Sequence, residues 1–494
     1  MDESNAGLQL ILETEKIAYK LKKRIISKPT GNKILVENSR AELILGNEFE
    51  KINYILSKFN LRCIIPLKEL FEIKSGKVLA WFFINETKRP AIVEKEDRIE
   101  FAFDIGKTFL ELVNERYYDV KEETHILSNT LIEKLYKNIP NKLRIFIYKK
   151  YYKKLHDKLK KSKEFNTLFP IDAAGFVLHN LFIELIKKNS DYVYIEYWPS
   201  QYKAVFMLTH DVEPTNYSYK KGIFILLSKL KLHKSTINLV SKYAKKKLIK
   251  TFSTENEIGC HGYIHDRKFA SIGRKERNER VKKAKKILKK MFGREVVGFR
   301  APALQKSKDL YDILWKNGFK YDMSMIDSQR EEPGCGKGVS YNLPYHIFDF
   351  KNKRFKKILE IPTAAPDCIS PLYFGYSLED TAKLFEIKKK WIYSIGGVCN
   401  FIIHAPAWGK EDAEQRMWLL DNISNIDKKG FWIATGREVN DWWRKRGNIL
   451  IKNKNTVINR NKDAIEFVIC RYNQRRVVSL GKNEKRIIKW NQKY

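Results

Sequence analysis

The chain has 494 residues, 43% of them hydrophobic and 13% aromatic, and it is too long for a single ordinary core. Two or more folded domains are expected, and this composition excludes an intrinsically disordered chain. Lys and Arg outnumber Asp and Glu by 95 to 58, which gives a net charge of +37. We interpret this excess as solvated surface charge, because dense basic runs such as residues 274–290 have helical apolar spacing. No specific nucleic acid partner is therefore expected.

Cysteine usage and the N-terminal segment predict a cytoplasmic protein. Six cysteines are scattered along the chain without a CxxC pair, which is typical of reduced thiols. The first residues, MDESNAGLQLILETEKIAYKLKK, lack the uninterrupted apolar run of a signal peptide. No apolar window of 18 residues occurs, so no transmembrane segment is expected.

Residues 1–195 mix helical stretches with short apolar runs and predict an N-terminal α+β domain. The runs at 78–84 and 143–148 are its clearest candidate strands. No motif in this region translates into chemistry, so its role stays open.

Between residues 196 and 445, short apolar runs alternate with amphipathic segments. The candidate strands are 204–208, 235–240, 296–299, 320–324, 358–361, 398–403 and 431–435. The clearest helical segments are 274–292, 307–316, 378–394 and 412–423. Gly293, Gly318 and Gly430 stand where helix ends favour a left-handed residue. The alternation predicts an α/β fold with about seven parallel strands, a distorted or incomplete (β/α) barrel.

Residues 446–494 predict a small C-terminal β appendage. Turn residues join three β-like runs, at 449–451, 464–471 and 475–480.

Polar residues follow several predicted barrel strands at the carboxyl ends, where reactive groups gather in this architecture. Asp211 and Glu213 follow the first strand and point to one side, because side chains alternate along an extended chain. His210 points to the other side. Two carboxylates can divide metal binding and proton abstraction between them. Acidic residues after a strand are also common loop residues, so this pair alone identifies no site.

A His-x3-His pair comes next, at His261 and His265. Both imidazoles can reach one ion when the segment makes a helical turn, and Gly259 and Gly262 allow the chain to turn tightly. Asp266 could orient one imidazole, or it could cap a helix.

Arg300 and His404 complete the set of candidate residues. Arg300 leaves a strand just before Pro302 and could hold a nearby carboxylate ionised, although a structural salt bridge explains it equally well. His404 follows the apolar run 398–403 and could protonate a leaving amine at the mouth of the barrel.

The order and spacing of these segments resemble the polysaccharide deacetylase family, also called carbohydrate esterase family 4. LTHDVE resembles its first motif, HGYIH its metal-binding histidine motif, RAP its third motif and FIIHAP its fifth. The likeness covers about residues 196–445. Its last part, ATGREVNDWW, is similar to the end of a subgroup whose first motif reads Thr-His-Asp-Val-Asp.

This resemblance implies a role for each residue. Asp211 would be the general base, Arg300 would tune it, and His404 would be the general acid. A divalent metal ion, expected to be zinc, would be held by Glu213, His261 and His265. Glu213 departs from the subgroup's Asp, and its extra methylene puts metal occupancy in doubt.

Two points of the resemblance stay open. A different register would make Asp211 the metal ligand and leave His210 in the base position. The family's remaining Asp, which polarises the general acid, has two candidates here, Asp322 and Asp327.

The predicted function is that of a metal-dependent hydrolase that removes an N-acetyl group from an amino sugar or glycan, a non-peptide C–N bond. The predicted partner is thus a carbohydrate substrate, and a cytoplasmic glycan precursor or amino sugar fits the lack of an export signal. The alternative is a catalytically weak barrel that binds a polyanion or a glycan through its basic surface.

Overall fold

The computed structural model describes most of the chain. The described residues are 1–29, 32–35, 40–67, 69–117, 150, 170–199, 201–212, 218–229, 234–245, 255–328, 338–373, 375–407 and 409–491. Glu213 and the predicted strand at 143–148 lie outside them. None of the described helices is long and apolar enough to cross a membrane.

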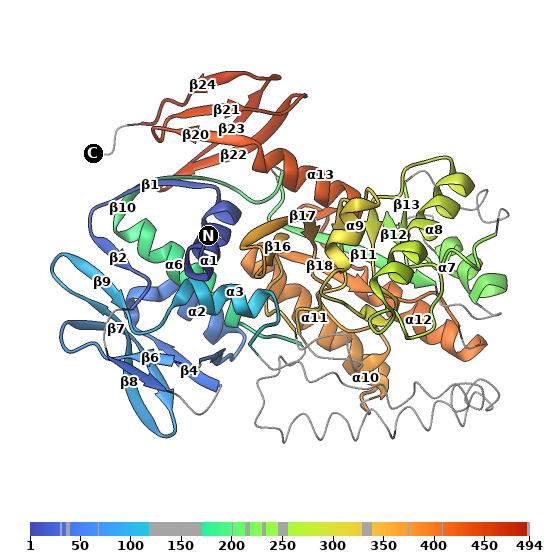
Figure 1. Cartoon of the computed structure of the whole chain (residues 1–494), viewed down its shortest axis with the longest axis horizontal. Coiled ribbons are helices and arrows are strands. Elements are labelled where there is room, and N and C mark those ends of the chain that lie inside the picture. Colours follow the sequence, from blue (N-terminus) through green and yellow to red (C-terminus); the bar gives the residue numbers. More distant parts are fainter. Residues whose placement is uncertain are drawn as a thin grey trace.

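A curled sheet of nine strands forms the centre of the described structure (Figure 1). Its order is β16-β17-β15-β14-β13-β12-β11-β18, and β19 also pairs with β11. All neighbours are parallel except β16, which runs antiparallel to β17 at one edge. The strands are β11 (Ala204–Val212), β12 (Ser235–Leu239), β13 (Glu257–Cys260), β14 (Gly298–Phe299), β15 (Tyr321–Asp322), β16 (Tyr345–Asp349), β17 (Arg354–Glu360), β18 (Val398–Ile402) and β19 (Phe431–Ile433).

Helices between these strands cover the sheet, as expected of βαβ units. They are α7 (Ile223–Lys229), α8 (Arg274–Phe292), α9 (Leu310–Lys316), α10 (Ser370–Tyr373), α11 (Leu378–Ile395), α12 (Lys410–Ile423) and α13 (Gly436–Gly447). The predicted helix 274–292 has the bounds of α8. Gly293 and Gly318 adopt left-handed backbone, with φ of 65° and 77°, whereas Gly430 does not. In β11 all nine residues are buried, which explains its nearly continuous apolar run.

The predicted number of about seven parallel strands is one too low within the described residues, which contain eight. The missed strand is β13, which has only four residues and includes Gly259. Glycine weakens a strand signal, and neighbours on both sides supply the hydrogen bonds that form β13. The expectation of an incomplete, distorted (β/α) barrel agrees with the curled sheet.

The N-terminal region contains a six-stranded sheet of order β2-β9-β8-β7-β4-β5 and a short pair, β3 with β6. Its helices are α1 (Glu3–Glu15), α2 (Glu50–Lys58), α3 (Ile105–Val113) and α6 (Ala174–Lys188). The strands are β2 (Arg24–Ile26), β3 (Lys33–Leu35), β4 (Arg40–Leu45), β5 (Cys63–Pro66), β6 (Glu69–Phe71), β7 (Lys77–Ile84), β8 (Thr87–Glu94) and β9 (Arg98–Phe101). The predicted strand 78–84 corresponds to β7.

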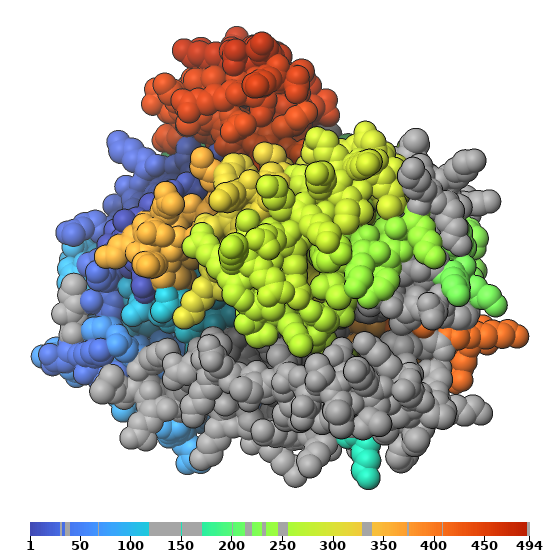
Figure 2. All heavy atoms as spheres, turned by 45° about the vertical axis from the view of Figure 1, so that its right-hand side comes forward, coloured from blue at the N-terminus to red at the C-terminus, as the bar shows by residue number. Residues whose placement is uncertain are grey.

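The C-terminal strands form a lobe that projects from the rest of the molecule, red in Figure 2. They are β20 (Ile449–Lys452), β21 (Thr456–Asn459), β22 (Ile465–Arg471), β23 (Gln474–Leu480) and β24 (Lys485–Ile487). Strands β22 and β23 share a sheet with β1 (Ile17–Leu21) and β10 (Ser190–Ile195). The domain boundaries near 195 and 445 stay predictions, since this sheet combines strands from both ends of the chain.

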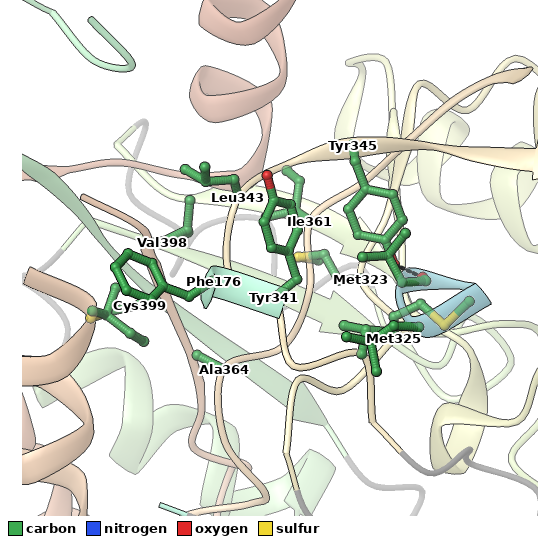
Figure 3. Close-up of a cluster of buried hydrophobic side chains, with 14 of the residues drawn as sticks. Phe176, Met323, Met325, Tyr341, Leu343, Tyr345, Ile361, Ala364, Val398 and Cys399 are labelled. Carbon is green, nitrogen blue, oxygen red and sulfur yellow. Dashed lines mark hydrogen bonds between the residues drawn. The ribbon is translucent and has the colours of Figure 1, made fainter. Parts of the chain in front are cut away.

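Helix α6 packs against the open side of the barrel. The segment after β17 reaches β18 through backbone bonds, from Ala364 N to Asn400 O (2.9 Å) and from Cys368 N to Ile402 O (3.1 Å). Phe176 of α6 belongs to the same buried cluster as Val398, Cys399 and Tyr341 (Figure 3). Its ring also meets Trp391 of α11 edge to face, at 5.3 Å between centroids. The barrel and the N-terminal region therefore share one hydrophobic core.

Replacing Gly175 by Ala tests how closely α6 packs against the barrel. An added Cβ would lie 2.4 Å from the Ser340 carbonyl oxygen, a backbone atom of the barrel side. Ala is favoured over Gly in a helix by about 0.5–1 kcal/mol, but relieving this overlap costs about 1–3 kcal/mol. We expect a lower free energy of unfolding in urea. Gly447→Ala, at the end of α13 with nothing within 4 Å, is the matched control and should not destabilise. Equal stability of the two variants would contradict close packing of α6 against the barrel.

Candidate active site

The carboxyl ends of four barrel strands bring four of the predicted residues together. Asp211 is the last residue but one of strand β11, His261 directly follows β13, and Arg300 directly follows β14. His404 comes two residues after the end of β18. The other three side chains approach Asp211 to between 3.0 and 4.0 Å, so Asp211 is the centre of the arrangement.

Asp211 is buried, and each of its oxygens has a different environment. Oδ1 accepts hydrogen bonds from Arg300 Nη1 (3.0 Å) and Asn238 Nδ2 (2.8 Å). Oδ2 faces His261 Nε2 at 3.8 Å and His404 Nε2 at 4.0 Å. Burial alone would raise the pKa of Asp211, but the charge of Arg300, the largest of the opposing effects, holds it below its ordinary value. This carboxylate is therefore ionised at neutral pH.

Arg300 is fully buried and its guanidinium is held from several sides. Besides Asp211, it donates from Nη2 to Thr209 Oγ1 (2.8 Å) and Asn400 Oδ1 (3.2 Å). Its Nε donates to the Met323 carbonyl oxygen (3.2 Å). These bonds fix the planar group, so its contact with Asp211 has a defined geometry.

The two histidines of the HGYIH segment lie side by side. His261 Nδ1 is 3.0 Å from the Arg300 carbonyl oxygen, which can only accept, so Nδ1 carries the proton and the lone pair is on Nε2. The rings of His261 and His265 have centroids 5.3 Å apart and are inclined by 47°. The Asp266 carboxylate accepts from Arg280 Nη1 at 2.8 Å and from Lys268 N at 3.2 Å.

These distances suit a tetrahedral metal ion with imidazole ligands. With bonds of about 2.0–2.1 Å, two imidazoles bound through Nε2 to one ion would have ring centroids about 5 Å apart. The observed 5.3 Å between the rings of His261 and His265 is close to this value. Among the residues that the structure describes, no group of three or more His, Cys, Asp and Glu converges on one point. The third predicted ligand, Glu213, lies outside those residues.

His404 has a carboxylate partner that sequence reasoning missed. Its Nδ1 lies 2.9 Å from Asp367 Oδ1, and this contact directs Nε2 towards Asp211. Arg416 of α12 donates from Nη1 to both oxygens of Asp367, at 3.2 and 2.9 Å. Burial would raise the pKa of Asp367, but Arg416 and then His404 lower it below its ordinary value.

The prediction that Asp322 or Asp327 partners His404 is therefore wrong. Asp322 accepts from Ser324 Oγ at 2.9 Å, and Asp327 pairs with the buried Lys388. Asp367 follows β17 by seven residues, in the segment that runs beside β18. Its position after a predicted strand was a usable signal, but only the pairing with β18 brings it to His404.

His210 lies on the opposite side of β11 from Asp211. Its Nδ1 is 2.7 Å from the Ile403 carbonyl oxygen, and burial lowers its pKa to about 4. At neutral pH this imidazole is uncharged and bound to the backbone of the neighbouring strand end.

The sequence of part of the barrel is similar to that of known proteins. Residues 200–321 match the sequence model of the family described as polysaccharide deacetylase. The chain contains a polysaccharide deacetylase domain. Over 86 residues it is 31% identical to the peptidoglycan deacetylase of Helicobacter pylori, a stretch that makes up 16% of this chain and 29% of that protein. The chain thus spans less than a third of the length of this curated relative.

Solved structures with similar folds cover about half of this chain. One from Pseudomonas aeruginosa, described as a polysaccharide deacetylase, is 16% identical, with a TM-score of 0.40 and coverage of 51% of this chain and 94% of that one. A family 4 acetyl xylan esterase from Clostridium thermocellum, solved with cobalt, is also 16% identical, with a TM-score of 0.29 and coverage of 48% and 89%. At such TM-scores these likenesses carry no weight in assigning the deacetylase domain.

Metal titration tests the paired histidines of the deacetylase domain. After chelator treatment, we expect the purified protein to bind one Zn²⁺ per chain, as measured by titration calorimetry. His261→Ala and His265→Ala should each weaken binding by at least about tenfold, since each removes a direct ligand. His346→Ala is the control, because His346 Nδ1 contacts the Ile358 carbonyl oxygen elsewhere in the sheet. Wild-type affinity in both site variants would exclude this pair as the ligands.

Proposed function

We propose that this chain is a metal-dependent hydrolase that removes an N-acetyl group from an amino sugar or glycan, cleaving a non-peptide C–N bond. One observation supports it most strongly. A buried, ionised carboxylate oxygen of Asp211 and the Nε2 atom of His404 face each other at 4.0 Å. Each is held from behind by a partner of opposite charge, Arg300 for Asp211 and Asp367 for His404.

This arrangement separates the two proton transfers that amide hydrolysis needs. Asp211 takes the proton of the attacking water through Oδ2, because Oδ1 is already occupied by two hydrogen bonds. His404 donates a proton from Nε2 to the departing amine, while Asp367 fixes the ring through Nδ1. The preference for Asp211 over His210 as the base follows from the contact of His210 with the Ile403 carbonyl.

The expected metal ligands are His261, His265 and Glu213, and zinc suits their nitrogen and oxygen atoms. When bound, the ion supplies polarisation of the amide oxygen and an acidified water with a pKa of about 7. Arg300 holds Asp211 in its ionised form throughout. The N-acetyl sugar as substrate is proposed from the deacetylase domain, and the cytoplasmic location stays a prediction.

Release of acetate from N-acetylglucosamine oligomers, in the presence of Zn²⁺, tests the proposal. Asp211→Asn keeps the size of the side chain but removes the proton acceptor, and His261→Ala removes a metal ligand. We expect each to lower kcat by about 10²–10⁴-fold. Equal acetate release by wild type and both variants would rule the proposal out.

A wild-type protein that releases no acetate would favour the alternative of a catalytically weak barrel that binds a polyanion or a glycan. In that case, retention of the protein on an immobilised polyanion, lost as salt rises, is the expected companion result.

The His404–Asp367 pair gives a separate prediction. Asp367→Asn should lower kcat by roughly 10²-fold, because the neutral amide no longer stabilises the protonated imidazole. Asp421→Asn is the matched control, since Asp421 is exposed and pairs only with Lys229 among the contacts described. Circular dichroism should show the same fold for both proteins. Full activity of Asp367→Asn would remove Asp367 from the proposed mechanism.

A further inference from the structure

The proposed function does not explain why Asn238 donates a second hydrogen bond to Asp211, or why glycine stands at position 259 next to Asn238. We propose that Asn238 is a positioning residue of this site, and that residue 259 is glycine because the Asn238 amide needs the space. The inference rests on the proposed function and concerns how the general base is held.

Three residues in neighbouring strands form one row across the sheet. Asp211 of β11 is in register with Asn238 of β12, and Asn238 is in register with Gly259 of β13. Partners in register point to the same face. The Asn238 side chain thus lies between the candidate base and the strand that leads to His261.

Asn238 is fully buried, and its Nδ2 donates to Asp211 Oδ1 at 2.8 Å. The opposite orientation of the amide would place its oxygen against the carboxylate, which is unfavourable. The atom that faces Asp211 is therefore the nitrogen Nδ2, and the oxygen Oδ1 points away. Its Oδ1 has no hydrogen-bond partner among the described residues. A buried polar atom without a partner disfavours folding, so a gain in stability does not explain why asparagine stands at position 238.

Gly259 provides the room that this amide occupies. A Cβ added at residue 259 would lie 2.0 Å from Asn238 Oδ1 and 3.1 Å from its Cγ. Glycine inside a strand weakens that strand, so its presence in β13 also has a cost in stability. Any larger residue would push the amide away from Asp211.

The consequence concerns the orientation of the Asp211 carboxylate. Arg300 and Asn238 approach Oδ1 from different strands, and two donors on one oxygen restrict rotation of the group. Oδ2 is thereby kept towards His261 and His404. Without Asn238, the single contact with Arg300 permits the carboxylate to turn.

Three variants test this arrangement through acetate release. Asn238→Ala should lower kcat about 10–100-fold while KM changes by less than about twofold, the pattern expected when a base is misaligned but the substrate still binds. Gly259→Ala should give a similar loss although Asn238 is retained. The double variant should be no worse than Asn238→Ala alone, because the shortened side chain accommodates the new methyl group.

Asn256→Ala provides the matched control, since Asn256 is another buried asparagine beside β12. Its Oδ1 accepts from Ser235 N at 3.1 Å, at the end of the strand away from the site. It should lower the unfolding temperature and leave kcat unchanged. Wild-type kcat in both Asn238→Ala and Gly259→Ala would overturn the inference.

Crystal structures of the wild type and Asn238→Ala separate this inference from the proposed function. We expect Asp211 Oδ2 to turn away from His261 Nε2 in the variant, and an unchanged Asp211 conformation would overturn the positioning role whatever the activity. A wild type that releases no acetate, together with a turned carboxylate in the variant, would reject the proposed function and support the role of Asn238.

Discussion

The buried ion pair between Arg300 and Asp211 is the interaction on which the candidate site depends. Arg300 has no exposed side-chain surface and Asp211 only 3%, so both charges have left water. Such a pair is tolerable only when each partner has further hydrogen bonds, and removing one partner typically costs about 3–5 kcal/mol. Thr209, Asn400 and the Met323 carbonyl supply those bonds to Arg300. The site is therefore rigid before any substrate binds, as a general base requires.

The second pair, His404 with Asp367, depends on a different part of the fold. Asp367 belongs to the segment that runs from β17 along β18, and Arg416 of α12 holds it in place. Arg416 also binds Asp412, whose carboxylate accepts from the backbone of Ala407. The match to the deacetylase family ends at residue 321, so this half of the site rests on geometry.

The N-terminal region packs against the barrel, a structural role that could not be predicted from its sequence. Its helix α6 packs on the side of the barrel where an irregular segment lies beside β18 and bonds to it. On that side, the Tyr345 hydroxyl donates to the Val113 carbonyl oxygen of the N-terminal region. The Tyr341 hydroxyl forms a hydrogen bond with His179 Nδ1 of the same region. Arg446 at the end of α13 binds the backbone carbonyls of Thr14, Glu15, Ile195 and Glu196. The barrel and this region therefore share a core.

Local pattern alone was enough for several features of this protein. Helix α8 was predictable because its apolar spacing and Gly293 lie within one continuous segment. The candidates His261 and His265 were found from their spacing of four residues, although the segment 261–265 does not form a helical turn. Asp211, Arg300 and His404 were found because each comes at the end of a strongly apolar run. Only the tertiary structure identified strand β13, Asp367 as the partner of His404, and Asn238 as a donor to Asp211. Each of these depends on strand neighbours that are distant in the sequence, and no short window of residues contains that information.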